Sequence, residues 1–232
     1  MNFQKMHQDY PNYRSQHGED KIIAAILDHI GSGYMRCMEF GAADGFFCSN
    51  TTPLWKDRDW TATLVESEEK LYKKLRANTR DFPKVAAHHA EVHNVDDFVD
   101  YELDLLSIDI DGEEFDIWER TQHRHRIVCI EHNPTFPLHV HYHGGRWQGS
   151  SARSLYDLGI SKGYRLVAGT KTNLIFVREE EAGFMDDYDD TLEGNFDYSQ
   201  LNYVVTDYHG NFDVVGELPY SMVHRVKMGW HV

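Results

Sequence analysis

The clearest chemical signal in the sequence is a group of acidic and amide side chains that follow two apolar segments. The stretch "LLSIDIDGEEFDIWE" (105–119) carries Asp109 and Asp111 directly after apolar residues, and "RIVCIEHN" (126–133) also ends in polar residues. Carboxylates held so close together repel one another, so we expect water or a cation beside them. Oxygen ligands of this kind suit Mg²⁺ or Mn²⁺. Alternatively, Asp109 or Asp111 only caps the following helix. The predicted metal ligands are Asp109, Asp111, Glu131 and Asn133.

Histidines lie close to the same segments. His132 follows the apolar run 126–131, and "HVHYH" places His139, His141 and His143 at every second position. Imidazole accepts a proton near neutral pH, so we predict His132 as a general base and His143 as the second choice. On a strand the three alternating imidazoles would share one face and could bind zinc. A solvated loop with incidental histidines is the alternative, because no fourth zinc ligand is evident.

A glycine-containing turn follows an earlier apolar segment. "MEFGAADG" (38–45) places Gly41 and Gly45 after a predicted strand, with Asp44 between them. In doubly wound sheets the ligand lies beyond the carboxyl ends of the strands, and glycines let the backbone approach it closely. Taken alone, the pattern also fits an ordinary turn between a strand and a helix.

Glu66 indicates what this turn could hold. "TLVES" (63–67) ends the next predicted strand about 20 residues later, where an acidic side chain can accept hydrogen bonds from both hydroxyls of a ribose. The spacing fits a nicotinamide dinucleotide or S-adenosylmethionine. A dinucleotide needs G-x-G-x-x-G, whereas "GAADG" lacks the middle glycine. The Asp44 carboxylate would repel a pyrophosphate but tolerate a sulfonium, so the sequence favours S-adenosylmethionine.

The elements that position these residues alternate between strand and helix, which predicts a mostly parallel sheet with helices on both faces. Apolar residues at helical spacing predict a helix over 19–30. Two neighbouring apolar segments, 164–170 and 172–179, would form a terminal antiparallel pair, and 203–215 a hairpin in an appended lobe. The other predicted strands are 34–40, 61–67, 84–92, 103–111 and 126–133, and the other predicted helices are 68–79, 113–122 and 151–164.

Several of these blocks together resemble the FkbM-type branch of class I S-adenosylmethionine-dependent methyltransferases. They lie between about residues 15 and 178 in the order expected for that family. The resemblance implies a Rossmann-like fold whose seven-stranded, mostly parallel sheet ends in an antiparallel hairpin. The blocks are "SQHGEDKIIAAIL", "MEFGAADGFFCSNT", "LLSIDIDGEEFDIW", "RIVCIEHN" and "LVAGTKTNLIFVR".

The resemblance also implies roles for individual residues. Glu39 would belong to the cofactor loop, Glu66 would hold the ribose, and Glu91 would lie near the adenine. The segment 15–20 would fold over the site and bring Gln16 to the ligand. The acidic group at the two strand ends is similar to the metal site of catechol-type O-methyltransferases, where a metal orients the acceptor hydroxyl. The predicted cofactor-binding residues are Gln16, Glu39, Gly41, Ala42, Asp44, Gly45, Asn50, Glu66, Glu91 and Asp109.

Composition limits the partners and the compartment. The chain has 232 residues, 41% of them apolar, and a net charge of -15, which predicts a globular protein. The negative charge argues against a nucleic-acid backbone or an anionic membrane as partner. Three cysteines without CxxC spacing, and no apolar signal segment, predict a soluble cytoplasmic protein. We expect a cofactor-binding domain over 1–180 and an acidic extension over 181–232, packed on that domain or at an interface of a homo-oligomer.

We therefore predict an S-adenosylmethionine-dependent O-methyltransferase that acts on a hydroxyl of a sugar, a glycan or a similar small polar acceptor. The predicted catalytic residues are His132, Asp109 and His143, with a divalent metal assisting. A nicotinamide-dependent oxidoreductase is an alternative that the "GAADG" turn disfavours. A non-catalytic binding protein on the same fold is a second alternative, because fold alone does not establish activity.

Overall fold

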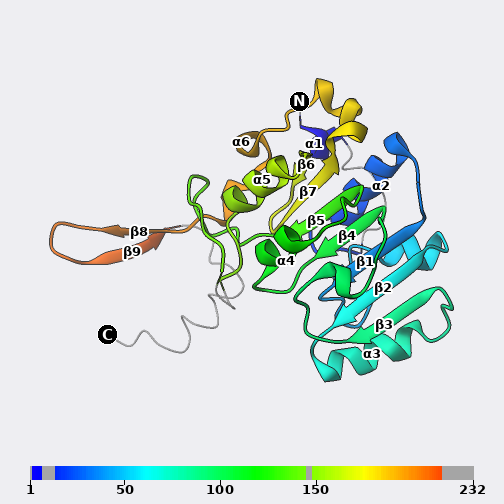
Figure 1. The fold of residues 1–232 in the computed structure, drawn as a ribbon. Helices are drawn as coiled ribbons and strands as arrows, with labels where there is room; N and C mark the ends of the chain where they lie inside the picture. The colour runs from blue at the N-terminus through cyan, green and yellow to red at the C-terminus, as the bar shows by residue number, and fades with distance from the viewer. Residues whose placement is uncertain (1, 7–13, 145–147, 216–232) are drawn as a thin grey trace.

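A computed structural model of the chain describes residues 2–6, 14–144 and 148–215. Its centre is a seven-stranded sheet with the order β3-β2-β1-β4-β5-β7-β6 (Figure 1). Every pair of neighbours is parallel except those of β7, which runs antiparallel to both β5 and β6. The predicted α/β fold with an antiparallel last hairpin is therefore confirmed. The strands are β1 (Arg36–Phe40), β2 (Thr61–Glu66), β3 (Val85–His89), β4 (Leu105–Ile108), β5 (Ile127–Glu131), β6 (Tyr164–Gly169) and β7 (Asn173–Arg178).

The direction in which strands are added reverses at β1. β1 pairs with β2 on one side, with Arg36 opposite Thr61, and with β4 on the other, with Cys37 opposite Leu105. The chain thus builds β2 and β3 outward in one direction and β4 and β5 in the other. In open α/β sheets ligands bind beyond the carboxyl ends of the strands at such a reversal. The ends of β1 and β4 are therefore where a site is expected.

Helices cover both faces of the sheet (Figure 1). The apolar stripe of α2 (Glu19–Ile30) packs on one face together with α3 (Glu69–Thr79) and the π-helix η1 (Pro53–Asp57). The other face packs against α4 (Glu114–Arg120), α5 (Ala152–Ser161) and the short helix η2 (Val95–Asp97). Because the strands are buried on both faces, they read as almost continuous apolar runs.

Two core layers result from this arrangement. Side chains alternate along each strand, so Leu105 lies in one layer and Leu106 in the other. Trp55 anchors the first layer, and Trp118 packs against Phe176 in the second, with ring centroids 5.1 Å apart. Within the described residues no helix is long and apolar enough to cross a membrane.

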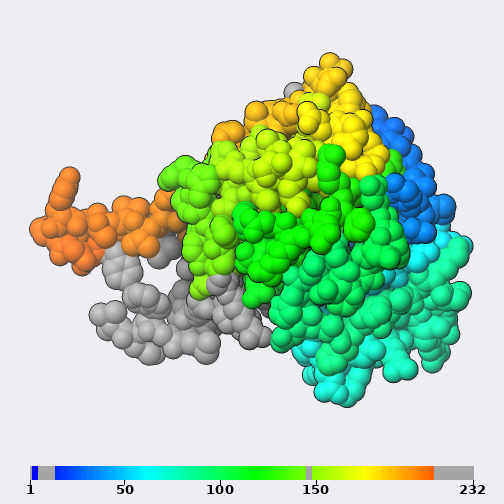
Figure 2. All heavy atoms as spheres, in the orientation of Figure 1, coloured from blue at the N-terminus to red at the C-terminus, as the bar shows by residue number. Residues whose placement is uncertain are grey.

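The C-terminal extension divides into a packed part and a projecting part. The helical segments η3 (Glu179–Asp187), α6 (Leu192–Asn195) and η4 (Tyr198–Gln200) lie on the domain, and η3 and α6 pack beside β6 along with α1 (Phe3–Met6). Their contacts bury Met185, Leu192 and Phe196. The strands β8 (Tyr203–Thr206) and β9 (Phe212–Val215) then form the predicted hairpin, which projects away from the domain (Figures 1 and 2).

The sequence pattern did not indicate α1, α6 or the short η segments. Most contain too few residues to show a helical periodicity, and η3 is interrupted by non-helical backbone angles at Ala182. β4 is also shorter than the predicted 103–111, because the chain leaves the ladder after Ile108 and Asp111 adopts a positive φ of 60°.

A buried ion pair joins the amino-terminal ends of the central strands. The Asp104 carboxylate accepts hydrogen bonds from the Gly33 and Tyr34 amides at 2.7 and 2.8 Å, and from Arg126 Nη1. Arg126 Nε also donates to Glu181 at 2.9 Å. The pair thus ties the segment before β1 to the starts of β4 and β5 and to the extension.

Asp104→Ala should lower the free energy of unfolding by about 3–5 kcal/mol, because it leaves the buried Arg126 guanidinium without one of its two carboxylate partners and the Gly33 and Tyr34 amides without their acceptor. Glu180→Ala is the matched control, since it removes the carboxylate of an exposed pair with Arg124 (2.9 Å) and should cost less than about 1 kcal/mol. Urea unfolding of both variants measures the difference. Equal costs would show that the buried pair does not hold the strand ends together.

Candidate functional site

The glycine turn after β1 is shaped by the protein around it. Gly41, Ala43 and Gly45 have positive φ angles of 74°, 48° and 86°. A Cβ on Gly41 would lie 1.7 Å from the Asp109 carbonyl oxygen, and one on Gly45 would lie 2.8 Å from Leu75 Cδ1. The expectation that these glycines make room for a ligand is therefore corrected, since the space that a side chain would occupy is filled by β4 and α3.

Glu66 lies against this turn at the carboxyl end of β2. Its buried carboxylate accepts a hydrogen bond from the Ala43 amide at 2.8 Å and another from the Glu68 amide at 2.7 Å. The end of β2 and the turn after β1 are thus joined directly. A carboxylate offers about four lone-pair directions, so acceptor capacity remains for the hydroxyls of a ribose.

Glu39 and Asn50 point into the domain. The Glu39 carboxylate accepts from Ser49 Oγ at 2.6 Å, from Thr51 Oγ1 at 2.7 Å and from the Asn50 amide at 2.7 Å. Burial raises the pKa of Glu39, and these hydrogen bonds oppose that shift. The Asn50 side chain donates to Ser107 Oγ at 3.0 Å. Both residues join the loop segment 49–51 to the central strands β1 and β4. Their contact with a cofactor stays a prediction.

Asp44 closes the turn on itself. Its Oδ1 accepts from the amides of Phe46 and Phe47 at 3.0 and 2.9 Å. Ala42 is buried beside it. The carboxylate therefore occupies amide donors that a phosphate group could otherwise use.

The segment before α2 reaches the loop that follows the glycine turn. Ser15 forms an isolated parallel bridge with Cys48, and Gln16 follows it as an exposed residue. Glu91 is exposed shortly after the end of β3. The contacts of Gln16 and Glu91 with a ligand stay predictions.

The acidic ends of β4 and β5 meet, as predicted. Asp109 is half-buried and hydrogen-bonded to the Glu131 side chain, and the Asp111 amide donates to Glu131 Oε2 at 3.0 Å. Burial and, after it, the charge of Asp111 raise the pKa of Asp109, and the hydrogen bond with Glu131 lowers it. The net result is a pKa of about 7. Burial, followed by the charge of Asp109, also raises the pKa of Glu131 well above its usual range. A proton held between the two carboxyl groups therefore reduces their repulsion.

The predicted metal site finds no support in the part of the chain that the structure describes. No group of three or more His, Cys, Asp or Glu side chains there is arranged to hold a metal ion. Asp109 and Glu131 bond to each other, and Asn133 Oδ1 accepts from the Thr135 amide and hydroxyl at 2.9 and 2.6 Å. Asp111 lies exposed on its turn. The predicted ligands therefore do not converge on one point.

Two buried acidic residues near this edge were not predicted from the sequence. Glu114 is fully buried, and its Oε1 accepts from the Gly112 amide at 2.6 Å, while Oε2 has no hydrogen-bond partner among the described residues. Burial raises its pKa. Glu19 is also fully buried and accepts from Thr170 Oγ1 at 2.6 Å. Both open a helix, where an acid in the first turn is normally exposed, so nothing in the pattern marked them.

His132 does not lie at an open strand end. Its side chain is buried under the extension, with its ring centroid 5.9 Å from that of Phe196. Burial lowers the pKa of His132 to about 4, so the imidazole is neutral at pH 7. The first choice for the general base is thus corrected, since His132 cannot reach an acceptor from this position.

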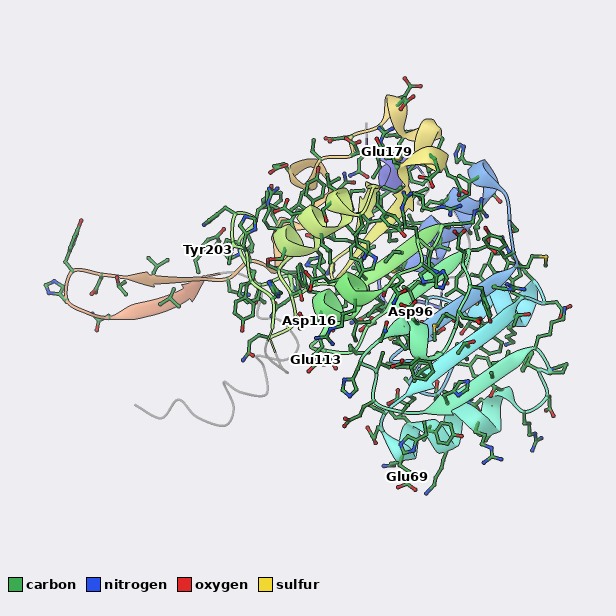
Figure 3. All side chains as sticks on the ribbon, viewed as in Figure 1. Glu69, Asp96, Glu113, Asp116, Glu179 and Tyr203 are labelled. Atoms are coloured by element: carbon green, nitrogen blue, oxygen red, sulfur yellow. The ribbon has the colours of Figure 1, made fainter. Side chains whose placement is uncertain are left out.

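The other histidines separate from one another. The segment 139–144 is not a strand, so its imidazoles do not share a face. His141 Nδ1 lies 3.3 Å from Asp157 Oδ2, whereas His143 stacks on Phe115 with ring centroids 3.9 Å apart. The zinc alternative is therefore not supported. Figure 3 shows Glu113 and Asp116 at the start of α4, where the exposed His143 borders the site.

Solved structures share this architecture. The domain is similar to the CMeT domain of the citrinin polyketide synthase, with a TM-score of 0.50 and 12% identity over 69% of this chain and 51% of that chain. It is also similar to an S-adenosylmethionine-dependent methyltransferase from Clostridium acetobutylicum ATCC 824, with a TM-score of 0.50 and 6% identity over 75% of this chain and 95% of that chain. The chain has a class I methyltransferase fold.

At these identities the likeness shows the fold alone, and this chain spans about half the length of the polyketide synthase structure. No protein-family model matches the sequence, and no curated protein matches it. The resemblance to the FkbM-type branch therefore stays a prediction, while the methyltransferase fold that it implied is confirmed.

Gly41→Ala should destabilise the protein by at least about 3 kcal/mol, because strain at positive φ adds to overlap with the Asp109 backbone. Gly18→Ala is the matched control, since its φ is 87° and the nearest atom to a new Cβ would be 3.9 Å away. It should cost only about 1–2 kcal/mol. Chemical unfolding checks both, and equal costs would mean that β1 and β4 can separate without loss.

Asp109→Asn should make stability less dependent on pH. The folded-state pKa of Asp109 is about 7, above the ordinary 3.8, so its stabilising contribution is complete below about pH 4 and is lost as the pH rises through 7. Asn has nearly the shape of a protonated Asp and stays uncharged at every pH. The difference in unfolding free energy between variant and parent should shift by about 2 kcal/mol in favour of the variant from about pH 4 to about pH 8; this figure allows for the partial exposure of Asp109. Urea unfolding with chelator present measures it, and a pH-independent difference would contradict the raised pKa.

Proposed function

We propose that the chain binds S-adenosylmethionine at the carboxyl ends of β1, β2 and β4 and transfers its methyl group to a hydroxyl of a sugar, a glycan or a similar small polar acceptor. One observation carries the proposal: the glycine turn bonds to Glu66 where the strand order reverses. That position is the ligand site of open α/β sheets. The methyltransferase fold supports the same reading.

The donor groups at this position suit a cationic cofactor better than a dinucleotide. A pyrophosphate is normally held by free backbone amides of a glycine turn. Here Asp44 accepts from the amides of Phe46 and Phe47, and Glu66 accepts from the amide of Ala43. The remaining groups are carboxylates, which attract a sulfonium and an amino group and bind ribose hydroxyls. The nicotinamide alternative therefore has no feature that favours it.

The residues of this chain would act mainly by positioning. S-adenosylmethionine, when bound, supplies a methyl group on a sulfonium that an oxygen nucleophile displaces in line. Glu66 holds the ribose end, and Asp109 lies at the neighbouring strand end, half-buried. With a pKa of about 7, Asp109 is suited to take the proton of the acceptor hydroxyl, while Glu131 holds it by a hydrogen bond. Orienting two reactants in this way supplies much of the acceleration in a displacement reaction.

Aromatic pairs border the loop after β5 and support a sugar-like acceptor. Phe136 stacks on Tyr142 with centroids 4.8 Å apart, and Phe115 stacks on His143. Each pair joins an apolar face to a polar tip, which suits a ring that carries hydroxyls. His143 is exposed there and is a second candidate for the base.

The predicted divalent metal has no role in this mechanism, because its predicted ligands do not converge within the described residues. Its test is direct. A chelator that abolishes methyl transfer without changing S-adenosylhomocysteine affinity, with activity restored by Mg²⁺ or Mn²⁺, would reinstate it.

Glu66→Ala should weaken binding of S-adenosylhomocysteine by roughly 10- to 150-fold, equal to about 1.5–3 kcal/mol for a hydrogen bond to a charged group. Glu66→Gln should keep the fold of the turn while losing the charge. The exposed Glu68→Gln is the matched control and should bind like the parent. Calorimetry with S-adenosylmethionine, S-adenosylhomocysteine and NAD checks both the site and the cofactor. Binding of NAD alone would overturn the proposal.

Turnover separates an enzyme from a binding protein. A methyl-transfer screen over sugars, sugar nucleotides and glycans should find an acceptor, and Asp109→Asn should lower kcat while leaving S-adenosylhomocysteine affinity within about threefold. Tight cofactor binding without transfer to any acceptor would favour the non-catalytic alternative.

A further inference from the structure

The projecting hairpin leaves apolar side chains without a partner. Val204 is 69% exposed, Tyr208 is fully exposed, and Tyr203 and Val205 are more than half exposed. All four residues of β8 are exposed, so neither face of the strand packs on the domain. An isolated two-stranded hairpin is at best marginally stable in water. We call residues 203–215 the arm and ask what surface could cover it.

A strand edge elsewhere on the chain also lacks a partner. β3 is the last strand of the sheet on its side, whereas β6, the last on the other side, is covered by α1, α6 and η3. The Lys84 carbonyl and the Ala90 amide bond toward β2, so alternate residues such as Ala87 direct their N–H and C=O outward. Among the described residues these groups of Ala87 have no backbone partner. Such an edge accepts an added strand.

A cationic groove runs beside this edge. It has a volume of about 510 Å³ and is lined along α3 and the end of β3. Tyr72 stacks on His89 at one end, with ring centroids 5.0 Å apart. Arg76 has no ion-pair partner among the described residues, although the chain carries a net charge of -15. The principal lining residues are Glu69, Tyr72, Lys73, Arg76, Arg80 and His89.

The arm and the groove are complementary in charge. Residues 203–215 contain Asp207 and Asp213 and no lysine or arginine. Figure 3 shows Tyr203, at the base of the arm, on the left of the domain and Glu69, at the groove, at its bottom, and the arm points away from α3 (Figure 1). One copy of the chain therefore cannot join its own arm to its own groove.

We propose that the arm of one copy docks on the open edge of β3 of a second copy, beside the cationic groove of α3. The added strand bonds to the outward backbone groups of β3, Val204 and Val205 cover the groove wall, and Asp207 faces Arg76. Two such contacts made reciprocally close a dimer. The reciprocal contacts relate the two copies by a two-fold axis, and each contact joins an arm to an edge rather than an arm to an arm.

Added positive charge on the arm and reversed charge in the groove test the contact. The arm variant is Val204→Lys with Val205→Lys, and the groove variant is Arg76→Glu with Arg80→Glu; all four positions are exposed. Light scattering coupled to size exclusion should give the parent protein at least twice the chain mass of 27.1 kDa and each variant a single chain mass. Lys70→Glu with Lys74→Glu is the matched control, because it reverses two exposed charges on α3 outside the groove lining and should leave the parent mass unchanged.

Mixing the two variants distinguishes this contact from its rivals. The arm variant keeps an intact groove, and the groove variant keeps an intact arm, so the mixture should recover the mass of the parent. Arm-to-arm pairing predicts instead that the groove variant stays associated. A parent protein that is monomeric at its highest soluble concentration overturns the proposal, as does a groove variant that associates like the parent. Circular dichroism confirms that each variant is folded, and S-adenosylhomocysteine binding provides a readout of the separate cofactor site.

Discussion

The contact on which the site depends is the close approach of two strand ends, made possible by the missing side chain of Gly41. The Asp109 carbonyl oxygen lies where a Cβ of Gly41 would be. No other residue type allows β1 and β4 to meet there without displacing the backbone of one strand. Because they meet, the glycine turn that reaches Glu66 and the carboxyl groups that follow β4 and β5 share one edge of the sheet. The proposed cofactor position and the proposed acceptor position are neighbours for this reason.

The same edge concentrates negative charge, and the chain offsets it in two ways. Glu39 and Glu66 are buried and accept hydrogen bonds from nearby backbone amides, and Glu39 also accepts from two hydroxyls. Asp109 and Glu131 instead lie against each other, where burial and mutual repulsion favour one shared proton. Titratable groups perturbed by burial and by a specific neighbour are typical of functional sites. This edge therefore combines carboxyl groups of raised pKa with the position where such folds bind ligands.

The two edge strands of the sheet differ in what covers them, because the C-terminal extension packs on only one of them. Its first part covers the β6 edge and packs Met185, Leu192 and Phe196 into the core layers. The second part leaves the domain and exposes apolar side chains, while the β3 edge stays open. One edge of the sheet is thus closed by the chain's own residues, and the other is available for the proposed contact with a second copy.

Much of the fold could be predicted from the sequence, because strands buried on both faces and amphipathic helices leave strong periodic patterns. The alternation of elements, the last antiparallel pair and the meeting of the acidic ends of β4 and β5 all follow from such local signals. What the pattern could not decide is the surroundings of each side chain. Whether His132 is open or buried depends on Phe196, 64 positions later in the chain. Whether Asp109 binds a metal or shares a proton with Glu131 depends on distances across two strands. Residue types and spacing therefore determined the fold and the region of the site, whereas burial, hydrogen-bond partners and proton affinity were decided by contacts between segments that only the tertiary structure brings together.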